Sequence, residues 1–150
     1  MITEDRLHHI LGVARKAYKV AKAFGADEQF AREMFALGWN HDIGYEFGSH
    51  IHGNIGYMTL KSWKYSRYIA THGKADSIIL DLIWFIINYA DMTTSPTGEE
   101  VTLDERLEEI EGRYGKKHMC YIESKEVCDK LIKYKEDNNL CFTSTLKSKE

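Results

Sequence analysis

Residues 30–44 read Phe-Ala-Arg-Glu-Met-Phe-Ala-Leu-Gly-Trp-Asn-His-Asp-Ile-Gly and predict a helix with a polar end. The signals are an N-cap, an apolar stripe and a glycine stop: Asp27, then Phe30, Met34 and Leu37, then Gly44. His41 and Asp42 continue two neighbouring stripes of this helix, so both side chains reach nearly the same buried place. An unpaired carboxylate there is costly, so we expect a cation or an arginine beside it. A plain His–Asp hydrogen bond is the simpler alternative.

Helical periodicity extends along nearly the whole chain. Further helices are expected at 6–24, at 53–71 with a candidate break near Lys64, and at 75–91, 102–112 and 122–135. The Thr102-to-Glu105 spacing is a capping box, and 92–101 is a loop because it contains Thr-Thr-Ser-Pro-Thr-Gly. No alternating stretch indicates a sheet. The sequence therefore predicts an all-α bundle of about five to seven helices.

The 150 residues predict one domain. Pro96 is the only proline, and no Gly/Ser-rich stretch marks a linker. We expect the domain over 1–137, with a core at 6–92 and carboxy-terminal helices at 102–136. Residues 138–150 are polar, and we expect a flexible tail there.

Composition excludes several classes of protein. A net charge of −3 lacks the basic excess of a general nucleic-acid binder. No apolar run approaches the roughly 18 residues of a membrane span, and the acidic amino terminus is unlike a signal peptide, so a cytoplasmic location is expected. Three cysteines without a Cys-x-x-Cys pair argue against a disulfide framework and a thiolate zinc site.

Two more helix faces carry a possible metal ligand inward. His9 lies on the apolar stripe of the first helix, while His8, about 100° around it, points towards solvent. Asp91 ends an apolar column of the fourth helix that contains Leu80, Trp84 and Ile87. Together with His41 and Asp42, these residues favour one four-ligand site over separate buried residues that each find a hydrogen bond. Imidazole and carboxylate ligands suit manganese, iron, magnesium, zinc or nickel, as one ion or two.

A second set of histidines and basic residues follows the His-Asp pair. His50 and His52 precede the third helix and His72 precedes the fourth, and His52 or His72 is a candidate for a second ion or for the substrate. No acid occurs between Glu46 and Asp76, a stretch that contains Lys61, Lys64, Arg67 and Lys74. A solvated basic face is one interpretation. Beside a metal site, phosphate binding is the other.

The ordered motifs resemble the HD-domain superfamily of metal-dependent phosphohydrolases. They are Arg6-x-x-His9, His41-Asp42-Ile43-Gly44, His52-Gly-x-x-Gly56 and Tyr89-Ala90-Asp91. The resemblance covers about residues 6–92 and implies a helical HD-domain bundle with a central metal bound by His9, His41, Asp42 and Asp91. Tyr45 is a departure, since many members have lysine there.

This resemblance implies metal-dependent hydrolysis, and we expect a phosphoester or phosphoanhydride of a small, nucleotide-type substrate. Asp42, His52 and His72 are the candidate catalytic residues, and Arg6, Lys61, Lys64, Arg67 and Lys74 are the candidate phosphate-binding residues. Two alternatives stay open: a nucleotide-binding regulator with little turnover, and a two-iron oxygenase. Oligomeric state is not predicted.

Overall fold

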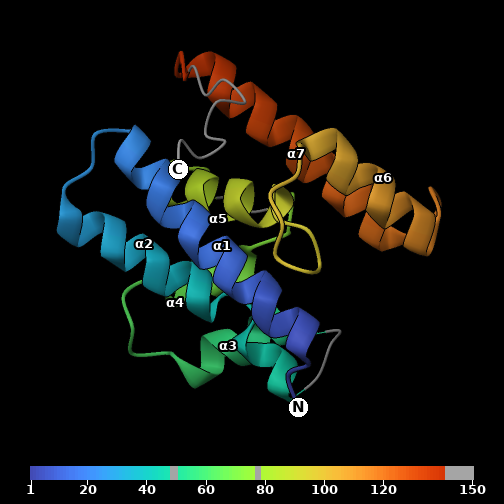
Figure 1. The fold of residues 1–150 in the computed structure, drawn as a ribbon, viewed down its shortest axis with the longest axis horizontal. Helices are drawn as coiled ribbons and strands as arrows, with labels where there is room; N and C mark the ends of the chain where they lie inside the picture. The colour runs from blue at the N-terminus through green and yellow to red at the C-terminus, as the bar shows by residue number, and fades with distance from the viewer. Residues whose placement is uncertain (48–50, 77–78, 141–150) are drawn as a thin grey trace.

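The structure, a computed structural model, describes residues 1–47, 51–76 and 79–140. Those residues form seven α-helices and one 3-10 turn, with no strand beyond an isolated bridge between Thr94 and Glu100. The elements are α1 (Glu4–Ala23), α2 (Glu28–Asn40), the 3-10 turn η1 (Ile43–Glu46), α3 (His52–Thr59), α4 (Ser66–Thr71), α5 (Leu82–Met92), α6 (Leu103–Tyr114) and α7 (Met119–Asp137). The predicted all-α class is confirmed for this part of the chain (Figure 1).

Helices α1 and α2 lie side by side and run in opposite directions (Figure 1). Each begins at a side chain that accepts a backbone N–H, Thr3 for α1 and the predicted Asp27 for α2. The helices approach closely at Gly38, where an added Cβ would stand 2.7 Å from the backbone of α1. This close approach brings the rings of His9 and His41 to a centroid distance of 5.5 Å.

Helix α5 is the apolar centre of the bundle and packs against α1, α2 and α7. Its start was predicted wrongly at residue 75. The helix begins at Leu82 because Asp81, in an extended conformation, accepts the backbone N–H of Trp84 at 2.9 Å. Leu80, expected in the column that leads to Asp91, precedes the helix and is 45% exposed. Within the described ranges, no helix is long and apolar enough to cross a membrane.

The expected helix over 53–71 is two short helices, α3 and α4, with a break that begins at Leu60 and includes Lys64. The two helices pack against each other at small residues. An added Cβ on Gly56 would stand 2.7 Å from the side chain of Ile69. His52 opens α3 and His72 follows α4, so this packing brings the two imidazoles together although 20 residues separate them.

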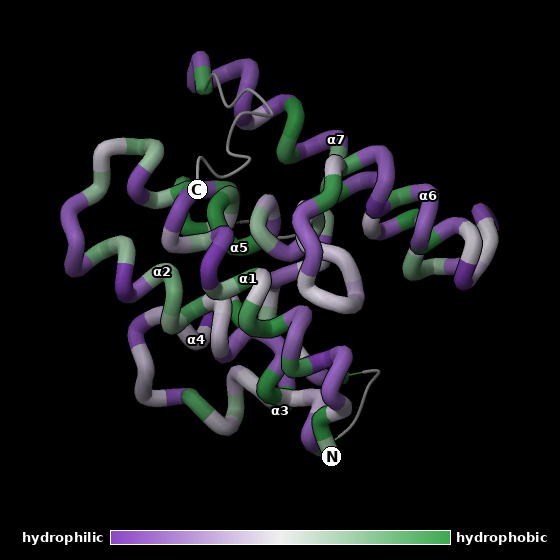
Figure 2. The backbone as a smooth tube through the Cα atoms, viewed as in Figure 1, coloured by the Kyte–Doolittle hydropathy of each residue, from purple (hydrophilic) through white to green (hydrophobic). Residues whose placement is uncertain are grey.

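The carboxy-terminal helices form a hairpin beside the bundle (Figure 1). The capping box predicted at Thr102 and Glu105 opens α6, and α7 is longer than the predicted 122–135. The hairpin is mostly hydrophilic (Figure 2), and α7 packs on α5. The buried residues of α7 are Val127, Cys128 and Leu131. Of the expected tail, residues 141–150 lie outside the described residues.

The packing of α7 predicts a difference between two thiols. Cys128 is 1% exposed and burial raises its pKa to about 12, whereas Cys120 is exposed. Because the thiolate is the reactive form, Cys128 should stay unreactive while the protein is folded. We expect a Cys141→Ser protein at pH 8 to release one equivalent of thiolate from a disulfide reagent, and two after denaturation. Fast reaction of both thiols in the folded protein would contradict the packing of α7.

Candidate metal centre

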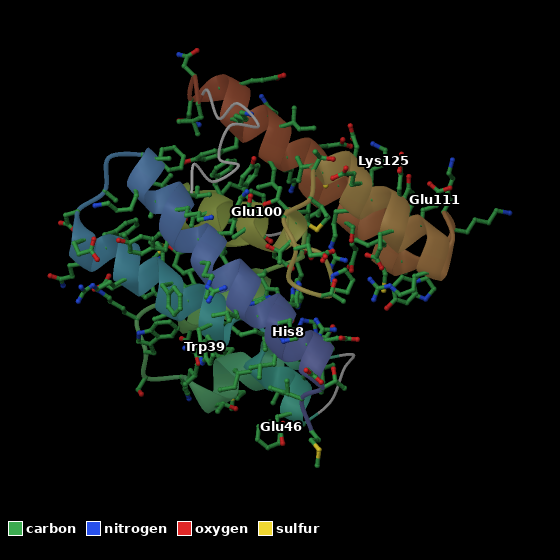
Figure 3. The ribbon with its side chains drawn as sticks, viewed as in Figure 1. His8, Trp39, Glu46, Glu100, Glu111 and Lys125 are labelled. Atoms are coloured by element: carbon green, nitrogen blue, oxygen red, sulfur yellow. The ribbon has the colours of Figure 1, made fainter. Side chains whose placement is uncertain are left out.

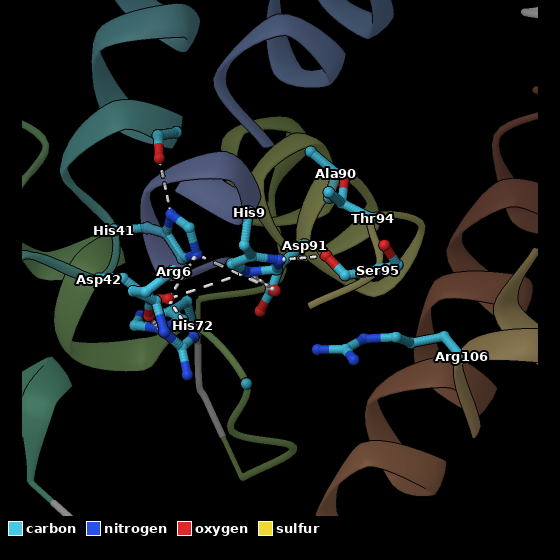
Figure 4. Close-up of polar contacts among 12 residues, drawn as sticks. Arg6, His9, His41, Asp42, His72, Ala90, Asp91, Thr94, Ser95 and Arg106 are labelled. Atoms are coloured by element: carbon cyan, nitrogen blue, oxygen red, sulfur yellow. Dashed lines mark hydrogen bonds and ion pairs between the residues drawn. The ribbon is translucent and has the colours of Figure 1, made fainter. Parts of the chain in front are cut away.

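Three buried histidines meet at the centre of the molecule, each from a different helix (Figure 4). His9 comes from α1, His41 from the end of α2 and His72 from the end of α4, and their exposed fractions are 1%, 0% and 6%. The Nδ1 atom of each ring lies at hydrogen-bond distance from a backbone carbonyl. The acceptors are Ser95 at 2.8 Å, Gly38 at 2.6 Å and Ile69 at 2.5 Å. A carbonyl oxygen only accepts hydrogen bonds, so Nδ1 carries the proton in all three rings.

The Nε2 atoms of these rings face the carboxylates of Asp42 and Asp91. His9 Nε2 lies 3.1 Å from Asp91 Oδ1, and His41 Nε2 lies 3.4 Å from Asp42 Oδ2 and 3.9 Å from Asp91 Oδ1. His41 Nε2 is buried without a hydrogen-bond partner among the described residues. In a neutral imidazole with a proton on Nδ1, Nε2 presents a lone pair. Lone pairs that face carboxylate oxygens repel unless a cation or a proton lies between them. At His72 a proton can do this, because Asp42 outweighs the effect of burial and raises the pKa of the ring.

The spacing of these atoms suits a bound cation. Ligand atoms about 2.1 Å from a divalent ion stand about 3 to 3.5 Å apart in tetrahedral or octahedral geometry. The separations among His9, His41 and the two carboxylates run from 3.1 to 3.9 Å. The Nδ1 hydrogen bonds also hold each ring in the orientation that a metal-binding histidine needs. His9, His41 and Asp91 therefore fit one cation position, and Asp42 lies beside it, with Oδ2 3.4 Å from His41 Nε2 and 3.8 Å from His9 Nε2. These four residues are the metal cluster hereafter.

A second position lies on the other side of Asp42. Its Oδ1 atom is 3.4 Å from His72 Nε2 and 3.5 Å from His52 Nε2, and these two nitrogens are 3.0 Å apart. The two oxygens of Asp42 thus face different sets of histidines. A carboxylate placed in this way can bridge two ions, so the arrangement fits either a second cation or a hydrogen-bonded histidine pair.

Charge at the cluster is set by burial and by neighbours. Burial alone would raise the pKa of Asp42, but His41, His72 and Arg6 together hold it well below its ordinary value. The Asp91 side chain is 15% exposed; burial alone would raise its pKa, but the neighbouring His9 and His41 lower it. Burial lowers the pKa of His41 to about 4, so its ring is neutral at pH 7. At neutral pH the cluster thus holds two carboxylates and an uncharged His41.

Arg6 and Tyr45 cover one side of the cluster. Arg6 Nη1 donates to Asp42 Oδ2 at 2.7 Å, and its guanidinium lies 4.0 Å above the ring centroid of Tyr45. The ring of Tyr45 in turn stacks on His52 with centroids 4.1 Å apart. Tyr45 therefore supplies an aromatic layer between Arg6 and His52.

The other basic residues proposed to bind phosphate are placed elsewhere. Lys64 donates to Glu33 of α2 at 3.0 Å, and the Arg67 guanidinium lies over the ring of Tyr68. Lys61 and Lys74 are exposed, and within the described part of the chain neither contacts the metal cluster. The acid-free stretch is thus partly neutralised in space by Glu33, a residue distant in sequence. His50 lies outside the described residues.

Residues that the sequence did not single out hold two ligands in place. Asn88, buried in α5, accepts the backbone N–H of Gly73 at 2.7 Å and donates to the carbonyl of Trp84 at 2.9 Å. It fixes the turn that follows His72. The sequence did contain a signal for Asn88, because an amide inside the most apolar helix needs buried hydrogen-bond partners. The sequence contained no signal for the role of the Ser95 carbonyl, since every residue type has a backbone carbonyl.

Comparisons of the chain with family models, curated proteins and solved structures found no match. What the site does is therefore inferred from its own side chains and from the motifs in the sequence.

The loop that carries Ser95 gives a test of how His9 is oriented. An added Cβ on Gly12 of α1 would stand 2.7 Å from the carbonyl oxygen of Gly98 and 2.7 Å from the side chain of Thr94. We expect Gly12→Ala to push this loop away and to lower the free energy of unfolding by about 1–3 kcal/mol. Urea unfolding measures that change, and the loss of the His9 Nδ1 hydrogen bond should appear in the imidazole nitrogen NMR shifts.

Gly112→Ala is the matched control. Gly112 is also helical, in α6, and nothing lies within 4 Å of its added Cβ. Alanine is the better helix former, so this variant should gain up to about 1 kcal/mol. Equal stability of the two variants would show that the loop does not pack on Gly12.

Proposed function

We propose that this chain is an HD-type metal-dependent phosphohydrolase that cleaves a phosphoester or phosphoanhydride of a nucleotide-type substrate. The observation that supports the proposal is the convergence of unprotonated Nε2 atoms on the buried carboxylate of Asp42 and the partly buried carboxylate of Asp91. His9 and His41 face Asp42 and Asp91 in this way, with His41 Nε2 buried and unpartnered among the described residues. The ordered motifs that resemble the HD-domain superfamily contain the same four residues.

The donor set fits a divalent cation held by His9, His41, Asp42 and Asp91. Such an ion, when bound, supplies Lewis-acid polarisation of a phosphate oxygen and lowers the pKa of a coordinated water. The carboxylates hold their negative charge at neutral pH because their pKa values are lowered. Without a cation they would repel a phosphate, so binding of cation and substrate should be coupled.

Arg6 and the second pair of histidines supply the remaining chemistry. The Arg6 side chain is 29% exposed, so it reaches solvent while it donates to Asp42. A guanidinium in that position suits a phosphate oxygen. The His52 side chain is 24% exposed and contacts both Asp42 and the buried His72. His52 is therefore placed to pass a proton between solvent and the reacting group, while His72 and Asp42 orient it.

A second candidate function follows from the two positions that share Asp42. His52, His72 and Asp42 Oδ1 could hold a second ion, and two irons bound to imidazoles and carboxylates are the site of a di-iron oxygenase. That function requires iron in both positions and uptake of oxygen. The guanidinium beside Asp42 favours an anionic substrate, so the hydrolase is the preferred proposal.

Adjacent histidines of α1 provide a paired test. His9 is 1% exposed and faces Asp91, whereas its neighbour His8 is exposed (Figure 3). We expect His9→Ala, purified without chelator, to lose bound metal and to lose more than about 100-fold of its phosphate release from a panel of nucleotides. His8→Ala should keep both. The measurements are elemental analysis and a phosphate assay.

Several results would count against the hydrolase. Unchanged turnover in His9→Ala, or in protein freed of metal, would exclude a mechanism that depends on this cluster. Two irons per chain with oxygen uptake and no phosphate release would favour the oxygenase.

A further inference from the structure

Helix α6 faces the metal cluster through Arg106 (Figure 4), although its sequence lies outside the HD-like motifs. Charges on this helix and around the cluster also act on shared neighbours. The charges of Asp104, near the start of α6, and of Asp91 both act on the buried thiol of Cys128. At the other end, Tyr114 acts on the phenol of Tyr45, which covers the cluster with Arg6.

Arg106 points from α6 towards the metal cluster, as Figure 4 shows. The residue is only 9% exposed, which is unusual for an arginine. Its Nε atom is buried and has no hydrogen-bond acceptor among the described residues. Its Nη1 atom donates to Glu109. Because a guanidinium has five N–H donors, this one bond leaves much of its donor capacity unused.

The contact with Glu109 does not explain why Arg106 is buried. Glu109 is three residues along the same helix, so the pair does not join α6 to the bundle. Glu109 also accepts from Arg113, which is 41% exposed. The carboxylate thus binds one buried and one exposed arginine, and its contact with Arg106 holds that guanidinium in a fixed orientation.

We propose that Arg106 binds a phosphate group of the substrate at the metal cluster, from the side opposite Arg6. This inference rests on the proposed phosphohydrolase function and names a residue that recognises its substrate. The planar guanidinium can donate two parallel hydrogen bonds to one phosphate, which a lysine cannot do. Arg6 is 29% exposed and donates to Asp42, whereas Arg106 has a buried Nε without an acceptor among the described residues, so Arg106 offers an anion a second, buried guanidinium.

The test compares three variants of α6 in protein loaded with manganese. Inorganic phosphate is the probe, and its binding is measured by the broadening of its phosphorus NMR signal. We expect Arg106→Met to weaken phosphate binding about 10- to 100-fold with unchanged manganese content. Arg106→Lys should recover only part of the loss, because lysine keeps the positive charge but cannot donate two parallel hydrogen bonds to one phosphate. Arg113→Met, the matched control, removes the exposed arginine from Glu109 and should stay within about twofold of wild type.

Each outcome bears on one proposal or the other. Wild-type affinity in Arg106→Met, or an equal loss in Arg113→Met, would overturn the role of Arg106. If Arg106→Met does not fold, Arg106→Lys decides, and phosphate affinity equal to wild type in that variant would overturn the bidentate contact. Phosphate binding that depends on Arg106 without any turnover would support this inference and contradict the hydrolase. Turnover with a KM that Arg106→Met leaves unchanged would support the hydrolase and contradict the role of Arg106 in phosphate binding.

Discussion

Two carboxylates, one buried and one partly buried, face unprotonated imidazole nitrogens, and this is the constraint on which the rest of the structure depends. Asp42 and Asp91 keep their charge because their pKa values are held below the ordinary range, at Asp42 in part by Arg6. The backbone carbonyls opposite Nδ1 fix the tautomer of His9 and of His41, so neither ring can neutralise a carboxylate without gaining a second proton. A divalent cation resolves this repulsion with ligands that are already in place, which is why the site favours metal chemistry over a plain hydrogen-bonded cluster.

The helices bring the candidate ligands together because each of them ends at, or passes, the same point in the bundle. α1 and α2 bring His9 and His41 together through the close approach at Gly38. The short pair α3 and α4 adds His52 and His72, and α5 adds Asp91 from the apolar core. The carboxy-terminal hairpin adds Ile110, Val127, Cys128 and Leu131 to this core and directs Arg106 towards the metal cluster (Figure 4). The bundle thus gathers the candidate ligands at one point, with Arg6 at Asp42 and Arg106 directed towards them from α6.

Helical phase predicted that the four proposed ligands point inward, because His9, His41 and Asp42 lie on stripes whose burial follows from their apolar neighbours, and Asp91 follows Trp84 and Ile87 along α5. Other features depend on contacts between distant segments. Lys64 contacts Glu33 rather than the cluster because the chain breaks between α3 and α4. The position of Arg106 near the site could not be predicted, since the sequence of α6 does not indicate which face of this helix meets the core. The late start of α5 came from the cap at Asp81, a competing local signal within an apolar run.

The central claim is that the converging nitrogens and carboxylates bind a cation. Anomalous X-ray diffraction from crystals of protein purified without chelator tests it most directly. The account predicts an anomalous peak about 2.0–2.2 Å from Nε2 of His9 and of His41 and from one oxygen each of Asp42 and Asp91. No peak at this position after soaking with manganese, with His9 and Asp91 joined by a direct hydrogen bond, would contradict it.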